Sequence, residues 1–261
     1  MKTLQSICES TLHRDYMFDG HIHLFSHRGL NPDSLCPMCV GFADIELDHL
    51  KDYDVPALYD KYLPQVRCMY PLATGLTIDD IKSIYKAHKD KIAGFGELKL
   101  YDSFKDKPLN FKKISFAREV CKFSEECGCL PVYIHYELCT AREVQFLSNL
   151  LNDFPDVPVV LCHCGMNQNN HQYAYGVVVE LMSQYSNLWV DVSWDASDWF
   201  SHNPMLLTQL DRDRVIWGSD LSPRLAAHGY ISSSPSKIEV NRQFISTYLD
   251  SDTNIIKLFK K

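Results

Sequence analysis

The sequence predicts an α/β protein folded as a (β/α)8 barrel. Short apolar segments typical of strands alternate with segments typical of amphipathic helices along most of the 261 residues. Regular strand–helix alternation indicates βαβ units and a parallel sheet. The strand segments are apolar almost throughout, as expected for strands buried on both faces. A doubly wound sheet is the alternative fold, but no G-x-G-x-x-G motif opens any of the expected helices.

Seven strands are expected, at residues 18–25, 66–73, 92–101, 130–136, 157–164, 187–194 and 214–220. No convincing eighth strand is evident between residues 30 and 65. The sequence is therefore also consistent with a distorted barrel, or with a degenerate second strand. The chain length suits a single barrel, and we expect one domain over residues 1–261.

The clearest helices lie between the later strands. Apolar residues from 114 to 127 follow the i, i+3, i+4, i+7 spacing of one helix face, and Gly128 is placed to end that helix. The same spacing recurs over residues 144–151 and 177–185.

The composition limits the classes of partner. The net charge of −7, without any basic run, argues against nucleic acid or an anionic membrane surface. No apolar stretch is long enough to span a bilayer, and the N-terminus lacks the apolar core of a secretory signal. We therefore expect a cytoplasmic protein whose ten cysteines are reduced. Cys36 and Cys39 have C-x-x-C spacing, but a structural zinc would normally need a second pair nearby, so we interpret them as part of a reduced loop.

Ionisable residues stand at the ends of five expected strands. They are His21 and His23, Glu97 and Lys99, His135, His163, and Asp220. The C-terminal ends of barrel strands are where active sites are built, from side chains of several strands. Five strands ending in this way predict a functional site, although a single buried histidine would not.

Imidazole and carboxylate ligands suit Zn²⁺, Mn²⁺ or Fe²⁺ better than Ca²⁺, which prefers oxygen ligands. Cys162 and Cys164 flank His163 in the sequence. Because side chains alternate along a strand, we expect both thiols to face the helices and to take no part in metal binding.

The ordered set of residues, opening with Asp19-Gly20-His21-Ile22-His23, resembles the amidohydrolase superfamily. The chain is most similar to its amidohydrolase-related (amidohydrolase 2) branch, which includes small-molecule hydrolases, lactonases and aromatic-acid decarboxylases. The ending with Asn254, Leu258 and Phe259 is also similar to that branch. Phosphoesterases of the polymerase-and-histidinol-phosphatase type share H-x-H but usually end in D-x-H, whereas Leu221-Ser222-Pro223 follows Asp220 here.

The resemblance implies a metal-ligand set. It assigns His21 and His23 to the first strand of the site, His135 and His163 to the fifth and sixth, and Asp220 to the last. Glu97 is similar to a metal-binding glutamate of TatD-type nucleases, while Lys99 is similar to a lysine that other branches use. One or two divalent ions are expected per chain, zinc before manganese or iron.

The resemblance and this chemistry predict a metal-dependent hydrolase of a small molecule. A metal-activated water would attack the substrate, with Asp220 as proton acceptor and His163 as a further acid or base. Lys99 and Arg224 are candidate contacts for an anionic substrate group. A metal-dependent decarboxylase of a small aromatic or unsaturated carboxylic acid is the alternative. A third hypothesis is a barrel that binds metal but has lost its catalytic activity. The presence of the predicted proton acceptor, Asp220, makes this hypothesis less favoured. The substrate and the oligomeric state, including a homo-oligomer, are not determined by the sequence.

Overall fold

The structure is a computed structural model that describes residues 19–24, 39–43, 66–70, 77–90, 92–100, 111–167, 169–220 and 243–259. Eight parallel strands form one sheet in the order of the chain, from β1 to β8. They are β1 (Asp19–Leu24), β2 (Cys39–Ala43), β3 (Val66–Tyr70), β4 (Ile92–Lys99), β5 (Val132–His135), β6 (Val159–Leu161), β7 (Leu188–Val192) and β8 (Val215–Trp217). The predicted α/β barrel class is confirmed.

The end of β8 meets β1 and closes the barrel. The backbone N–H of Asp220 donates to the carbonyl oxygen of His21 at 2.9 Å, and the Ser219 hydroxyl approaches the same oxygen at 3.4 Å. Gly218 and Gly20 lie at this seam, where the β1 segment and the β8 segment pack too closely for a Cβ atom at either position.

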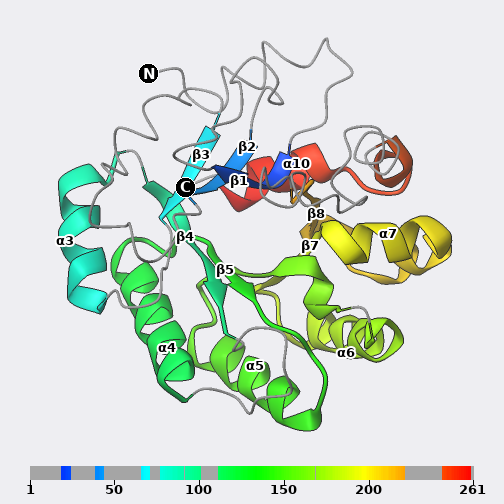
Figure 1. The fold of residues 1–261 in the computed structure, drawn as a ribbon, viewed down its shortest axis with the longest axis horizontal. Helices are drawn as coiled ribbons and strands as arrows, with labels where there is room; N and C mark the ends of the chain where they lie inside the picture. The colour runs from blue at the N-terminus through cyan, green and yellow to red at the C-terminus, as the bar shows by residue number, and fades with distance from the viewer. Residues whose placement is uncertain are drawn as a thin grey trace.

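The helices surround the strands. Figure 1 shows α3 (Ile78–His88), α4 (Phe111–Glu126), α5 (Ala141–Asp153), α6 (His171–Gln184) and α7 (Trp194–His202) following one another around the outside of the sheet. The predicted helices over 114–127, 144–151 and 177–185 correspond to α4, α5 and α6. Gly128, with φ of 90°, follows α4 as expected for a residue that ends a helix.

Several strand boundaries differ from those predicted. The missing strand is β2, a five-residue segment with a central glycine, Gly41, that gives only a weak strand signal. The strand predicted over 157–164 stops at Leu161, and Cys162–Gly165 form the short 3-10 turn η3 instead. The strand predicted over 187–194 stops at Val192, because Trp194 begins α7.

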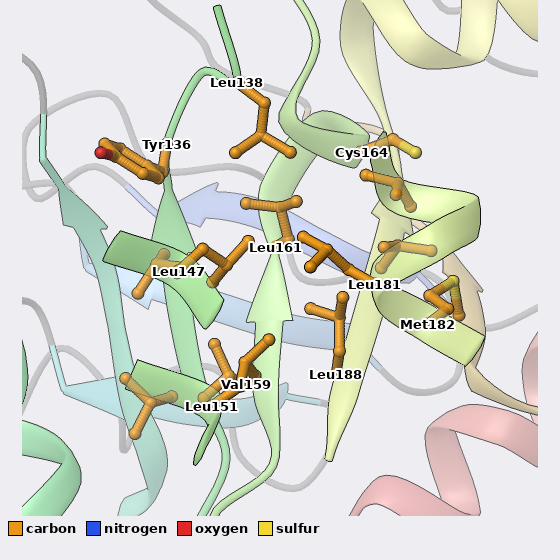
Figure 2. Packing of buried hydrophobic residues seen from close by; sticks show 14 of the residues in the cluster. Tyr136, Leu138, Leu147, Leu151, Val159, Leu161, Cys164, Leu181, Met182 and Leu188 are labelled. Carbon is orange, nitrogen blue, oxygen red and sulfur yellow. The ribbon is translucent and has the colours of Figure 1, made fainter. Parts of the chain in front are cut away.

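Two apolar layers lie on the two faces of the sheet. In the outer layer, Val159 and Leu161 of β6 pack among apolar side chains of α5 and α6 (Figure 2). The inner layer lies inside the barrel and includes Tyr133, Val160 and Ile216. The strands thus contribute alternate residues to the two layers, as expected in a barrel.

The C-terminal helix α10 (Ser251–Leu258) closes one end of the barrel interior. Ile255, Leu258 and Phe259 join the inner apolar layer. The Asn254 amide donates to the carbonyl oxygen of Val215, at the start of β8, at 2.7 Å. This end is filled by apolar side chains, so a site must lie at the opposite end, where the strands terminate. Within the described ranges, no helix has the length and apolar character required to cross a bilayer.

The seam between β1 and β8 should be sensitive to a single methyl group. A Cβ at Gly218 would lie 2.7 Å from the backbone nitrogen of His21 and still nearer its Cβ. We expect Gly218→Ala to lower the free energy of unfolding by about 1–3 kcal/mol, the usual cost of overpacking. Denaturant titration followed by circular dichroism would measure the change.

Gly176→Ala is the matched control for that change. Gly176 lies within α6, and a Cβ there would meet no atom within 4 Å. Alanine is favoured over glycine inside a helix by about 0.5–1 kcal/mol, so this variant should be slightly more stable than the wild type. Equal stability of the two variants would show that the seam is not closely packed.

Candidate metal centre

The structure brings most of the predicted site residues together at the C-terminal end of the barrel. His21 comes from β1, Glu97 from β4, His135 from the last position of β5, His163 from η3, and Asp220 from the segment after β8. All five are buried. Ligand atoms of His21, Glu97 and His163 lie within 4.8 Å of one another.

The Glu97 carboxylate is central to one half of the site. Its Oε1 lies 2.6 Å from Nδ1 of His135 and 3.6 Å from Nε2 of His163. Its Oε2 lies 3.4 Å from Nζ of Lys99, whose side chain is 46% exposed. Glu97 and Lys99 therefore lie side by side, with the carboxylate inside the protein and the ammonium group at its surface.

The other half of the site is arranged around His21. Nε2 of His21 lies 3.5 Å from Oδ1 of Asp220, and Nδ1 lies 2.5 Å from Oδ2 of Asp191. Both His21 and Asp191 are fully buried. Asp191 is not among the residues predicted from the sequence, although a carboxylate within the apolar segment Leu188–Val192 is a signal that could have identified it.

His163 is held by the residue that follows β7. Its Nδ1 lies 2.8 Å from the Ser193 hydroxyl oxygen. The half-buried indole of Trp194 stands edge-on to the His163 ring, with the ring centroids 5.6 Å apart. Trp194 therefore borders the site, whereas Trp199 stacks on His171 between α6 and α7.

Four non-glycine residues at this end of the barrel have left-handed backbone conformations; one is Cys164 in the outer layer, and the other three border the site. His163 has φ of 54°, Trp194 of 45° and Asp220 of 50°. Each such conformation costs about 1–3 kcal/mol, and strain of this kind is concentrated at functional sites. Each of the three residues follows a strand and is turned toward the same region.

The left-handed turn also explains why the predicted orientation of Cys162 was wrong. Val160 faces the barrel interior and Leu161 the helices, so simple alternation places Cys162 inside and His163 outside. The positive φ of His163 then turns its side chain inward. Cys162 consequently lies inside the barrel, with its Sγ within 4.8 Å of ligand atoms of His21 and Asp191. Cys164 does pack in the outer layer, as expected (Figure 2).

Burial and charge act in opposite directions on the titratable groups. Burial lowers the pKa of His21, but the Asp191, Asp220 and Glu97 carboxylates outweigh it and raise this pKa to about 10. Burial raises the pKa of Glu97, but Lys99, His135 and His163 hold it well below its usual range. Burial dominates at His135 and lowers its pKa to about 4, although Glu97 opposes it. Burial lowers the pKa of His163, but the nearby Glu97, Asp220 and Asp191 carboxylates outweigh it and raise this pKa.

This group of residues fits a divalent transition-metal ion. Three carboxylates, from Glu97, Asp191 and Asp220, lie buried beside imidazole nitrogens, so the region attracts cations strongly. The closely spaced ligand atoms of His21, Glu97 and His163 are nitrogen and oxygen, the donor types that zinc, manganese and iron accept. The Asp191, Asp220 and Glu97 carboxylates raise the pKa of His21, so they favour a positive charge at its ring, carried either by a proton or by a metal ion.

Some predicted residues lie outside the described part of the structure. Arg224 and Cys36 are among them, and of His23 and Cys39 only the backbone, in β1 and β2, is described. His23 pairs with Phe42 across the β1–β2 register.

The chain belongs to the amidohydrolase family. The family model described as "Amidohydrolase" matches residues 85–230, which is more than half of the chain. The protein is therefore an enzyme of a hydrolase family whose members bind divalent metal ions. Comparison with curated proteins gave no match.

Solved structures support the same fold. An amidohydrolase from Burkholderia multivorans with bound HEPES has a TM-score of 0.63 at 11% identity, covering 94% of this chain and 99% of that chain. A dihydroorotase from Campylobacter jejuni has a TM-score of 0.58 at 16% identity, covering 94% of this chain and 83% of that chain. A TatD family hydrolase from Entamoeba histolytica has a TM-score of 0.54 at 11% identity, covering 94% of this chain and 97% of that chain. At such low identities the similarity establishes the barrel fold alone.

The geometry predicts that metal content depends on His21. Purified from metal-supplemented medium, the wild type should contain one or two transition-metal ions per chain by elemental analysis. His21→Ala should lose or halve this content, and Glu97→Gln should lower the count if that carboxylate bridges two ions. His202→Ala, an exposed position on α7, is the control and should keep the full content. Wild-type protein without any metal would contradict the assignment of this site.

The two cysteines provide a second, independent prediction. Cys164→Ser should keep the metal and lose about 1–3 kcal/mol of stability, because it places a hydroxyl in the apolar outer layer. Cys162→Ser should also keep the metal, because the nitrogen of His21 that faces Asp191 is already engaged by that carboxylate. Loss of metal from folded Cys162→Ser, measured by elemental analysis, would identify Cys162 as a ligand.

Proposed function

We propose that this protein is a metal-dependent hydrolase of a small-molecule substrate. The observation that supports this most directly is the convergence of His21, Glu97 and His163 within 4.8 Å, with Asp220 beside them. The group lies where the barrel strands end, while α10 fills the opposite end. The amidohydrolase family assignment is consistent with hydrolysis at this position.

The proposed ligands are His21, His23, Glu97, His135, His163 and Asp220, with zinc as the preferred ion and one or two ions per chain. His23 enters this set on the sequence pattern alone: it follows His21 by two residues in β1, and residues two apart on a regular strand share a face. A crystal structure of the Burkholderia multivorans amidohydrolase, which shares the fold, holds bound zinc. A divalent ion in such a site polarises a substrate carbonyl or phosphoryl group and lowers the pKa of water.

Asp220 is the proposed proton acceptor. Its carboxylate is buried, lies 3.5 Å from His21, and is fixed by the backbone hydrogen bond between Asp220 and His21. A carboxylate fixed in this way can take a proton from the attacking water and return it to the leaving group. His163 is the second candidate for proton transfer, since its ring contacts Glu97 at 3.6 Å.

Lys99 is the proposed contact for a negatively charged substrate group. Its side chain is half exposed and its Nζ lies 3.4 Å from the Glu97 carboxylate, so Lys99 stands between solvent and the buried residues. Arg224 follows Asp220 by four residues and is proposed for the same task. A small anionic substrate suits both residues better than nucleic acid does, because the chain carries a net charge of −7.

An activity screen on zinc-loaded protein would test the reaction class. Lactones, amides, phosphoesters and aromatic carboxylates would be assayed in parallel, with release of carbon dioxide scored separately. Hydrolysis of at least one class, abolished by a chelator and restored by metal, is the expected result. Carbon dioxide release at an enzymatic rate without hydrolysis would replace the proposal by the decarboxylase alternative.

Asp220→Asn tests the role of the proton acceptor on whichever substrate the screen identifies. Asparagine keeps the shape and one oxygen but cannot accept the proton. We expect the variant to fold and to keep much of its metal, while its turnover falls by about 10²–10⁴-fold. Steady-state kinetics at saturating metal would measure this. Turnover near the wild-type value would show that Asp220 is not the proton acceptor, and His163 or Glu97 would then be the candidates for that role.

A further inference from the structure

Strand β7 and the residue directly after it supply two polar side chains that contact two of the proposed ligands. Asp191 lies within β7, and Ser193 is the residue between β7 and α7. Oδ2 of Asp191 lies 2.5 Å from Nδ1 of His21, and Oγ of Ser193 lies 2.8 Å from Nδ1 of His163. All four side chains are buried. Neither Asp191 nor Ser193 belongs to the ligand set proposed above.

The two contacts have the same consequence for the two rings. Both engage Nδ1, and in both rings Nε2 faces the site: that of His21 lies 3.5 Å from Asp220, and that of His163 lies 3.6 Å from Glu97. The rings themselves lie close together, with centroids 5.3 Å apart. A neutral imidazole can bind a metal through one nitrogen while the other donates a hydrogen bond.

We propose that β7 determines which nitrogen both histidines present to the metal, with Asp191 and Ser193 as positioning residues. This inference rests on the proposed metal site but not on the reaction catalysed there. By accepting the Nδ1 proton, Asp191 fixes His21 as the tautomer that binds metal through Nε2, and its negative charge strengthens that ring as a ligand. Ser193 does the same for His163 without adding charge.

The surroundings of Asp191 support this role. It is fully buried, and its other oxygen, Oδ1, has no hydrogen-bond partner among the described residues. A buried carboxylate is costly unless it is paired, and Oδ2 of Asp191 is paired with His21. An apolar residue at position 191 would match the inner apolar layer, to which its β8 register partner Ile216 belongs, and would pack at lower cost. The carboxylate is therefore explained by its effect on His21 rather than by packing.

A competing reading is that Asp191 itself binds an ion. Ligand atoms of His21, Cys162 and Asp191 also lie within 4.8 Å of one another. An ion there would have to displace the short contact between His21 and Asp191. The two hypotheses differ in the expected effect of removing the Asp191 charge. If Asp191 is a ligand, the number of ions bound per chain should fall. If it is a positioning residue, the affinity for the ion should fall and the number should not.

The test measures zinc binding in the full-length protein, by competition with a chromogenic chelator and by elemental analysis at saturation. Asp191→Asn and Ser193→Ala should each weaken zinc binding by about 10–100-fold, the usual effect of removing such a partner. Both variants should still reach the wild-type number of ions at saturating zinc. Unchanged affinity in both, or one fewer ion in Asp191→Asn, would overturn the proposal.

Ser197→Ala is the matched control for Ser193→Ala. Ser197 is a buried serine on α7, and its hydroxyl has no hydrogen-bond partner within the described parts of the chain. The Ser197→Ala variant carries the same chemical change four residues away and removes no contact to a histidine. Its zinc affinity should therefore be that of the wild type. A comparable loss of affinity in Ser197→Ala would attribute the effect to packing and reject positioning.

Nuclear magnetic resonance of the zinc-loaded wild type tests the same inference without any variant that might misfold. Long-range ¹H–¹⁵N correlation spectra of the imidazole rings should show zinc on Nε2 and a slowly exchanging proton on Nδ1 of both His21 and His163. Zinc on Nδ1 of either ring would contradict the proposal. A wild type that binds no zinc at all would instead reject the proposed function, so the two failures are distinguishable.

Discussion

The hydrogen bond from the Asp220 backbone to the His21 carbonyl is the contact on which both the fold and the site depend. At 2.9 Å it joins the end of β8 to β1 and so closes the barrel. The same contact places the Asp220 carboxylate 3.5 Å from the His21 ring. Closure is possible because Gly218 and Gly20 let the two backbones approach. In this protein, barrel closure and assembly of the site are one structural event.

The second constraint is the burial of charge. Glu97, Asp191 and Asp220 place three carboxylates inside the barrel mouth, where a buried charge is costly unless it is paired. Their negative charge is offset by His21, whose pKa the three carboxylates raise to about 10, and by the ammonium group of Lys99 beside Glu97. A bound divalent cation would neutralise more of this negative charge than a protonated histidine does. The strained backbone conformations of His163 and Asp220 are a further cost, and the contacts that these residues make within the site offset it.

Much of this could be predicted from local sequence patterns. Seven apolar segments and their intervening helices indicated the barrel, and the residues at the strand ends indicated where His21, Glu97, His163 and Asp220 would meet. The prediction was least accurate where the backbone departs from ideal geometry. β2 is short and contains Gly41, so its signal was weak. β6 ends before Cys162, and the left-handed turn that follows reverses the alternation on which the orientation of the cysteines was based.

The sequence by itself determined the fold class and which ionisable residues lie at the ends of the strands, because apolar periodicity and strand–helix alternation are local properties of the chain. Only the tertiary structure decided which of these residues touch. The contact between His21 and Asp191 joins positions 170 residues apart, and that between His163 and Ser193 joins positions 30 residues apart. No local pattern encodes such pairs, because they depend on the register with which eight strands close into a barrel.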